Sequence, residues 1–128
     1  MSVKHTCSAL VLSCIDFRFQ SSIRNFLVGS GLENEYDLLS RPGSSKDADQ
    51  ALIGNIALSL RLHGIKKVMV IHHQNCGAYG ERLISGSIEE LEKHKGDMQA
   101  NIELLKEKFP GLEFEAYFAN LSGEIVKV

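Results

Sequence analysis

Two runs of consecutive apolar residues, and a shorter third segment, stand out along the 128-residue chain. Residues 9–13 and 68–71 are apolar at nearly every position, and residues 36–39 form a shorter strand candidate that Arg41, Pro42 and Gly43 close. Strands that are apolar on both faces belong to parallel sheets covered by helices. The pattern therefore predicts three parallel strands.

Segments with helical spacing of apolar residues separate these strands. Residues 47–63 carry leucine, isoleucine and alanine at intervals of three and four, with Gly64 as a stop signal, and residues 21–28 predict a shorter helix. Both segments connect one strand candidate to the next. They fit the helical crossovers that parallel strands require.

Residues 87–109 predict a long, polar, amphipathic helix. Ser87 followed by Glu90 is the pattern of a capping box, and Gly96 is a candidate break that would divide the helix in two. The remaining residues, 112–128, predict two strands around the turn at Ser122 and Gly123.

This order of elements predicts an α/β fold with one domain spanning residues 1–128. We expect a mostly parallel central sheet, flanked by helices, with strand order 2-1-3-4 and an antiparallel fifth strand. In such sheets a ligand binds beyond the carboxyl ends of the strands, where the strand order reverses. That point lies between the first and third strands, which end next to Cys14 and to His73.

Composition narrows the classes of partner. The net charge is -2 and the isoelectric point is near 6.2, so no broad positive field indicates nucleic acid or an anionic membrane as a partner. The N-terminal residues resemble neither a secretory signal nor a membrane span, which predicts a cytoplasmic protein. Three cysteines in a reducing compartment are available for metal binding or catalysis.

Candidate chemistry gathers at the two predicted strand ends. Cys14, His73 and Cys76 offer two thiolates and an imidazole, which is a zinc-binding set with an open fourth position. Asp16 could fill that position as a fourth ligand, or it could accept a hydrogen bond from a zinc-bound hydroxide. Arg18 could hold Asp16 ionised through a two-pronged salt bridge.

The chain resembles the β-carbonic anhydrases through two motifs. The first is Cys-x-Asp-x-Arg, at residues 14–18, and the second is His-x-x-Cys-Gly, at residues 73–77. The resemblance implies a zinc ion held by Cys14, His73 and Cys76, with Asp16 and Arg18 as a catalytic dyad that orients or gates the metal. The implied activity is reversible hydration of carbon dioxide to bicarbonate by zinc-bound hydroxide.

The resemblance also implies a homodimer or a higher homo-oligomer with a small-molecule substrate, carbon dioxide or bicarbonate. Two departures from the family bear on that substrate. Ile15 and Phe17 are bulky where the family has small residues, and Pro42 follows Arg41 where the family has Arg-Asn-Ala-Gly. Related enzymes hydrolyse carbon disulfide or carbonyl sulfide, so these substrates stay open. The proton relay stays open between His72 and Tyr79.

Two further interpretations come from the residues themselves. A zinc-stabilised module, with its metal closed by Asp16, would bind or regulate without catalysis. Alternatively, Cys76 and Arg82 have the spacing of a tyrosine-phosphatase loop with a cysteine nucleophile. That loop would leave Cys14 and His73 without a role.

The other cysteine and the other histidines are not expected to bind the metal. We expect Cys7 to be structural or incidental, and His72 to pack beside the site or to support a ligand. His5, His63 and His94 are expected to be solvated.

Overall fold

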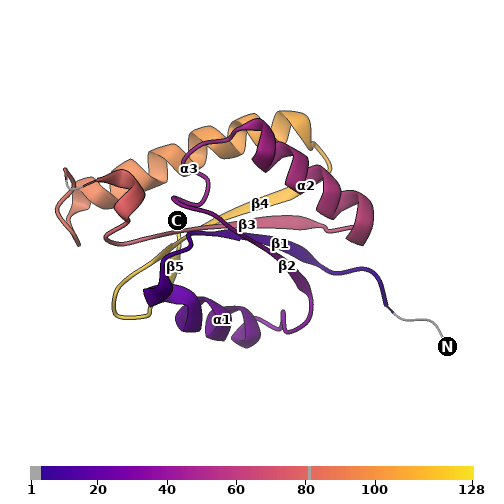
Figure 1. Ribbon diagram of the computed structural model, residues 1–128, viewed down its shortest axis with the longest axis horizontal. Coiled ribbons are helices and arrows are strands. Elements are labelled where there is room, and N and C mark those ends of the chain that lie inside the picture. The colour runs from indigo at the N-terminus through magenta and orange to yellow at the C-terminus, as the bar shows by residue number, and fades with distance from the viewer. Residues whose placement is uncertain (1–3, 81) are drawn as a thin grey trace.

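The structure is a computed structural model that describes residues 4–80 and 82–128. Its centre is a five-stranded sheet with the order β2-β1-β3-β4-β5 (Figure 1). The first four strands are parallel and β5 is antiparallel to β4. The strands are β1 Ala9–Ser13, β2 Tyr36–Ser40, β3 Lys67–His73, β4 Glu113–Ala119 and β5 Ile125–Lys127. The predicted fold class and strand order are confirmed.

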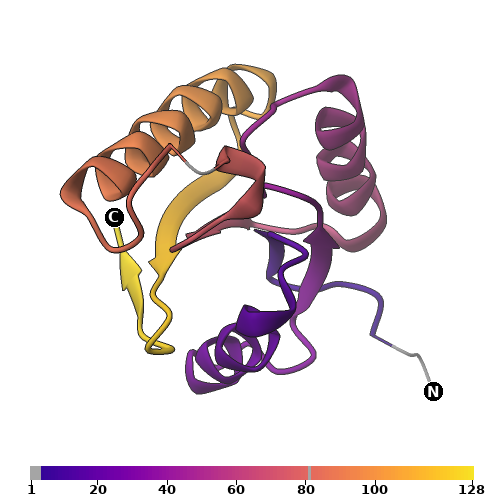
Figure 2. The same ribbon diagram turned by 60° about the vertical axis from the view of Figure 1, so that its left-hand side comes forward.

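In the described part of the chain, three α-helices cover the two faces of the sheet. Helices α2 and α3 lie on one face, and α1 lies on the opposite face, as Figures 1 and 2 both show. The helices are α1 Gln20–Gly29, α2 Gln50–His63 and α3 Ile88–Lys108. Within the described residues, no helix combines the length and the apolar character needed to cross a membrane.

Each face of the sheet has its own hydrophobic core. Successive side chains of a strand point to opposite faces, so β1 contributes Leu10 and Leu12 to one core and Val11 to the other. The first core includes buried side chains of α2 and α3, and the second includes buried side chains of α1. Parallel strands buried on both faces explain the continuous apolar runs in the sequence.

Helix α3 runs without a break through Gly96, so the predicted division into two helices is wrong. A glycine in an exposed helix position costs only about 1 kcal/mol relative to alanine. Packing of the buried side of α3 against the sheet outweighs that cost.

The buried side of α3 also carries His94. This residue is 1% exposed, so the expectation that His94 is solvated is wrong. Its spacing of four residues from Met98 places it on the helix face that packs inward.

Candidate metal centre

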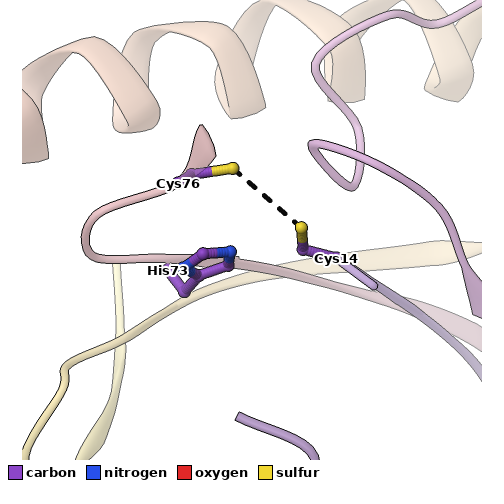
Figure 3. Close-up of side chains that lie close together, drawn as sticks. All are labelled: Cys14, His73 and Cys76. Atoms are coloured by element: carbon purple, nitrogen blue, oxygen red, sulfur yellow. Dashed lines mark hydrogen bonds between the residues drawn. The ribbon is translucent and has the colours of Figure 1, made fainter. Parts of the chain in front are cut away.

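The two motifs meet at the carboxyl ends of β1 and β3. These strands are parallel neighbours, with Leu12 opposite Val70. Cys14 directly follows β1, and His73 is the last residue of β3. Residues that are 62 positions apart in the chain, Cys14 and Cys76, therefore face each other (Figure 3). This is the strand-order reversal at which the sequence predicts a ligand.

Cys14, His73 and Cys76 form a buried cluster of metal-ligating atoms. One ligand atom from each residue lies within 4.8 Å of the other two, and the two Sγ atoms are 4.0 Å apart. Two sulfurs bound to one tetrahedral zinc at about 2.3 Å each would lie about 3.8 Å apart. The spacing of these side chains therefore fits a zinc ion.

The imidazole of His73 is oriented by the backbone of the next residue and by a neighbouring ring. Its Nδ1 lies 2.7 Å from the carbonyl oxygen of Gln74, so Nδ1–H donates to that oxygen. The ring packs on Phe19, with 4.2 Å between the ring centroids. Across the described part of the chain, the buried Nε2 has no hydrogen-bond partner. A buried nitrogen with a free lone pair beside two thiols is what a metal site requires.

The turn between His73 and Cys76 depends on Asn75. This residue has a φ of 60°, in the left-handed region that asparagine tolerates better than most residues. Glu90, on the first turn of α3 and only 3% exposed, accepts hydrogen bonds from the backbone N–H groups of Asn75 at 2.8 Å and Gly86 at 2.9 Å. A buried carboxylate thus fixes the turn that carries two candidate ligands.

The sequence did not predict this role of Glu90, because the capping-box pattern predicts that its carboxylate bonds to the backbone of Ser87. The first half of the box is present, since the Ser87 hydroxyl accepts from the N–H of Glu90 at 3.1 Å. In a complete box the Glu90 carboxylate would accept from the N–H of Ser87. Here it bonds to Gly86 and Asn75 instead.

Asp16 and Arg18 form a two-point ion pair next to the cysteines. Arg18 donates from Nη2 to Asp16 Oδ2 at 2.7 Å and from Nε to Oδ1 at 3.0 Å. Arg18 also donates to the side-chain and backbone oxygens of Asn75, each at 2.9 Å. Asp16 Oδ2 is 3.9 Å from His73 Nε2. The pair therefore connects both motifs.

The hydrogen bonds from Arg18 lower the pKa of Asp16 to about 2, although partial burial acts in the opposite direction. Asp16 is consequently an anion throughout the physiological range.

The thiols of Cys14 and Cys76 shift each other's pKa values in opposite directions. A hydrogen bond from the Cys76 thiol lowers the pKa of Cys14, and the same contact together with burial raises the pKa of Cys76. One thiolate is therefore favoured before any metal is bound.

His72 lies behind the cluster in a buried polar network. Its Nε2 is 2.8 Å from the Ser45 hydroxyl, and its Nδ1 is 2.8 Å from Nδ1 of His94. The Tyr79 hydroxyl is 3.4 Å from the same Nδ1 of His72. Burial lowers the pKa of His72 to about 3 and that of His94 to about 4. Both imidazoles are therefore neutral at pH 7, which agrees with a packing role for His72.

A pocket of about 360 Å³ lies beside Cys14 and Asp16. Ile15 and Phe17 line it without closing it, since these residues are 57% and 85% exposed. The rest of the lining comes from small or apolar residues, namely Pro42, Gly43, Gly77 and Ala78. The bulky residues of the first motif leave room for a small molecule.

The residues after Cys76 differ from a phosphatase loop. A short 3-10 helix, Gly77–Tyr79, follows the cysteine, and α3 does not begin until Ile88. The contact with Cys14, together with burial, raises the pKa of Cys76, whereas a phosphatase nucleophile needs a lowered pKa. These features disfavour the phosphatase interpretation.

Solved structures that share this fold include β-carbonic anhydrases and a carbon disulfide hydrolase. Superposition on the β-carbonic anhydrase CafD of Aspergillus fumigatus gives a TM-score of 0.67 at 11% identity, covering 95% of this chain and 89% of that one. A tetrameric β-carbonic anhydrase of Sordaria macrospora gives 0.65 at 16% identity, with coverages of 97% and 81%. A carbon disulfide hydrolase gives 0.64 at 15% identity, with coverages of 98% and 80%. The class of fold is that of the β-carbonic anhydrases.

Sequence comparison identifies the family. The model of a family described as "Putative carbonic anhydrase" matches residues 4–128, and the chain therefore belongs to that family. An uncharacterized protein of Rickettsia bellii (strain RML369-C) is 29% identical over 133 aligned positions, which cover 94% of this chain and 81% of the relative. The resemblance inferred from the two motifs is confirmed.

Proposed function

We propose that the protein is a zinc-dependent carbonic anhydrase that interconverts carbon dioxide and bicarbonate. Cys14, His73 and Cys76 would hold the metal, because their atoms have the spacing and the donor types of a catalytic zinc site. Zinc lowers the pKa of water that it binds to about 7, which supplies a nucleophile at neutral pH. The fourth coordination position of the metal would then be occupied by water or by Asp16.

The observation that carries the proposal is the ion pair of Asp16 and Arg18 beside these three residues. Arg18 keeps Asp16 ionised and points its carboxylate to the same side as His73 Nε2, 3.9 Å away. An ionised carboxylate in this position can accept the hydrogen bond of the reacting water and so fix the direction of its attack. A purely structural metal site does not need such a group.

The pocket supports a small apolar substrate. Apart from Cys14 and Asp16, its surface is formed by Ile15, Phe17, Pro42 and small residues, so few other groups can form hydrogen bonds with an incoming molecule. Carbon dioxide, carbonyl sulfide and carbon disulfide are all linear and weakly polar. The likeness to a carbon disulfide hydrolase makes the two sulfur compounds the second candidate substrates.

Stopped-flow hydration of carbon dioxide tests the proposal. The zinc-loaded chain should hydrate carbon dioxide between pH 7 and 9, and Cys76→Ser should lose both metal and activity. Zinc-loaded protein that is inactive over this range would contradict the anhydrase and favour the non-catalytic module. Hydrogen sulfide release from carbon disulfide or carbonyl sulfide, without carbon dioxide hydration, would favour the hydrolase.

The proposal includes a homodimer or a larger homo-oligomer. Four large apolar side chains near the pocket or near the start of α3 are exposed, namely Ile15, Phe17, Ile84 and Ile88. A second copy would remove such surface from water. The Sordaria macrospora enzymes are described as tetrameric. Analytical ultracentrifugation tests this point, since a monomer at micromolar concentration would contradict it.

The proposal also assigns the protein to the cytoplasm. The three cysteines are free in this structure, and two of them must stay reduced to bind a metal. Fractionation of the cells that produce the protein, with immunodetection in each fraction, tests this location. Detection only outside the cytoplasm would contradict it.

A further inference from the structure

A second cluster of metal-ligating side chains lies at the opposite end of the strands. Cys7 precedes β1, Asp37 is the second residue of β2, and His63 is the last residue of α2. One ligand atom from each residue lies within 4.8 Å of the other two. Figures 1 and 2 show the N-terminal segment and the end of α2 on the same side of the molecule. Three separate segments of the chain therefore meet here.

Backbone and side-chain contacts hold these three residues in place. The N–H of Cys7 donates to the carbonyl oxygen of His63 at 3.0 Å, which ties the first segment to the end of α2. Asp37 Oδ2 lies 2.7 Å from His63 Nδ1 and accepts from the Ser59 hydroxyl at 2.6 Å. The other oxygen of Asp37 is not used in these two contacts. The cluster is therefore arranged by the fold before any ligand arrives.

The donor set has the chemistry of a borderline-soft divalent cation. A thiolate, an imidazole and a carboxylate are each a known zinc ligand, and zinc sites combine them in tetrahedral arrays. All three side chains are only half-buried. A pocket of about 240 Å³, which His5, Asn34 and Tyr36 also line, opens beside them. A hydrated ion can therefore reach the cluster, and water can complete its coordination.

The positive charge nearest the pocket is compensated. Lys4 lines the pocket but forms an ion pair with Glu35, whose other oxygen accepts from the Ser8 hydroxyl at 3.0 Å. The charge of Lys4 is thus neutralised by Glu35 and not by Asp37. The carboxylate of Asp37 can therefore interact with a cation. This arrangement favours a metal ion over an anionic ligand.

The same three residues, Cys7, His63 and Asp37, could also form a catalytic triad with the cysteine as nucleophile. A nucleophilic cysteine needs a stabilised thiolate, with a histidine close enough to take its proton. Partial burial and the charge of Asp37 instead raise the pKa of Cys7, whose thiol contacts the carbonyl oxygen of Ala9 at 3.7 Å. These surroundings disfavour a nucleophilic thiolate in the metal-free protein, whereas a bound metal ion would itself displace the thiol proton.

From this geometry we infer that Cys7, Asp37 and His63 form a second site for zinc or a similar divalent cation. Such an ion would link the segment before β1, the edge strand β2 and the end of α2. Its role is to fasten the edge of the sheet, since the pocket of the first site lies at the other end of the strands. The inference is independent of the proposed carbonic anhydrase activity.

Titration with cobalt(II), a spectroscopic substitute for zinc, tests the inference on the full chain after chelator treatment. Thiolate-to-cobalt absorption bands report each site that contains cysteine. We expect two cobalt ions per wild-type chain. Cys7→Ser should lower the stoichiometry by one ion, both in the wild type and in Cys76→Ser. Tyr36→Phe, which removes only a hydroxyl from the pocket lining and none of the three ligands, should leave the stoichiometry unchanged.

An unchanged stoichiometry in Cys7→Ser would overturn the inference, whatever the activity of the first site. Conversely, carbon dioxide hydration by Cys7→Ser should equal that of the wild type. Protection of the Cys7 thiol from alkylation is a second measurement that needs no variant. Zinc should slow alkylation of Cys7 in the wild-type chain, as followed by mass spectrometry of the Cys7 peptide, and an unchanged rate would again overturn the inference.

Discussion

Arg18 holds the carboxylate of Asp16 at two points, with its Nη2 2.7 Å from Oδ2 and its Nε 3.0 Å from Oδ1. The same guanidinium reaches Asn75, in the turn between His73 and Cys76. A single side chain thus couples the direction of the carboxylate to the position of the second motif. The first two predictions concern this coupling.

Arg18→Lys should lower kcat/KM for carbon dioxide hydration by about 10- to 100-fold. Lysine keeps the positive charge but cannot donate to two oxygens in one plane and reach Asn75 as well. The zinc content should stay at the wild-type level, as measured by atomic emission. Arg24→Lys, at an exposed position of α1, is the matched control and should retain full activity. Wild-type activity in Arg18→Lys would show that the charge alone is sufficient.

Asp16→Asn should lower kcat/KM by at least about 100-fold while zinc remains bound. The amide has nearly the shape of the carboxylate, but it lacks the charge that orients the reacting water. Metal analysis and stopped-flow assays on the same preparation separate the two effects. Loss of zinc in this variant would instead identify Asp16 as a required metal ligand.

Glu90→Gln should lower the free energy of unfolding by about 1.5 to 3 kcal/mol. The buried carboxylate accepts two backbone N–H groups, and the amide of glutamine can accept with only one oxygen. Urea denaturation measures the change. Glu89→Gln, at the exposed neighbouring position, is the control and should stay within about 0.5 kcal/mol of the wild type. Equal stability of Glu89→Gln and Glu90→Gln would contradict the role of Glu90 in fixing the turn.

Gly43→Ala should destabilise the fold by about 2 kcal/mol. Gly43 has a φ of 75°, a left-handed conformation that costs other residues about 1–2 kcal/mol. An added Cβ would also lie 3.1 Å from Cβ of Ala78, which is closer than ordinary contact.

Gly96→Ala is the matched control for Gly43→Ala. Apart from its chain neighbours and the backbone of its own helix, no atom of the described residues lies within 4 Å of a Cβ added at Gly96, which is inside α3. This substitution should therefore raise the free energy of unfolding by about 0.5 to 1 kcal/mol. Thermal and urea unfolding of both variants measure the contrast, and a destabilised Gly96→Ala would contradict the regular geometry of α3.

Asp49 should make stability depend on pH in the acid range. Hydrogen bonds from Arg41 lower the pKa of Asp49 to about 2, below its ordinary value of 3.8. A lowered folded-state pKa gives a stabilisation that is complete above pH 3.8 and is lost as the pH falls through 2. Asp49→Asn keeps a residue that can cap α2 but removes the charge.

The difference in unfolding free energy between Asp49→Asn and the wild type should therefore shrink as the pH falls from 5 to 2. Urea denaturation at a series of pH values measures it. Asp47→Asn serves as the control, because Arg41 contacts the backbone oxygen of that residue and not its carboxylate. A difference that is constant with pH would contradict the ion pair.

The sheet and the first site were predictable because their signals are local or follow a simple topological rule. Apolar runs identified β1 and β3, and the common strand order of such folds made them neighbours. Cys14, His73 and Cys76 then had to converge. The roles of the three residues in binding and catalysis stay predictions until a metal and an activity are measured.

Other features depend on contacts that no local pattern carries. The carboxylate of Glu90 accepts a hydrogen bond from the turn at Asn75 and does not complete the capping box. His94 is buried because it lies on the face of α3 that packs against the sheet. The expectation that His63 is solvated is also wrong, since its ring is half-buried and contacts Asp37. In each case the partner comes from a different element of the fold, so sequence spacing within one element gave no signal.

The separation of 62 residues between Cys14 and Cys76 has a thermodynamic consequence. An unfolded chain keeps these two thiols apart, so a metal would bind the folded state far more tightly than the unfolded one. Metal affinity and folding then become linked equilibria, in which a hundredfold excess of free zinc over its dissociation constant adds about 2.7 kcal/mol to stability. Scarcity of zinc in the cell would then reduce the amount of folded protein as well as its activity, and so control its lifetime.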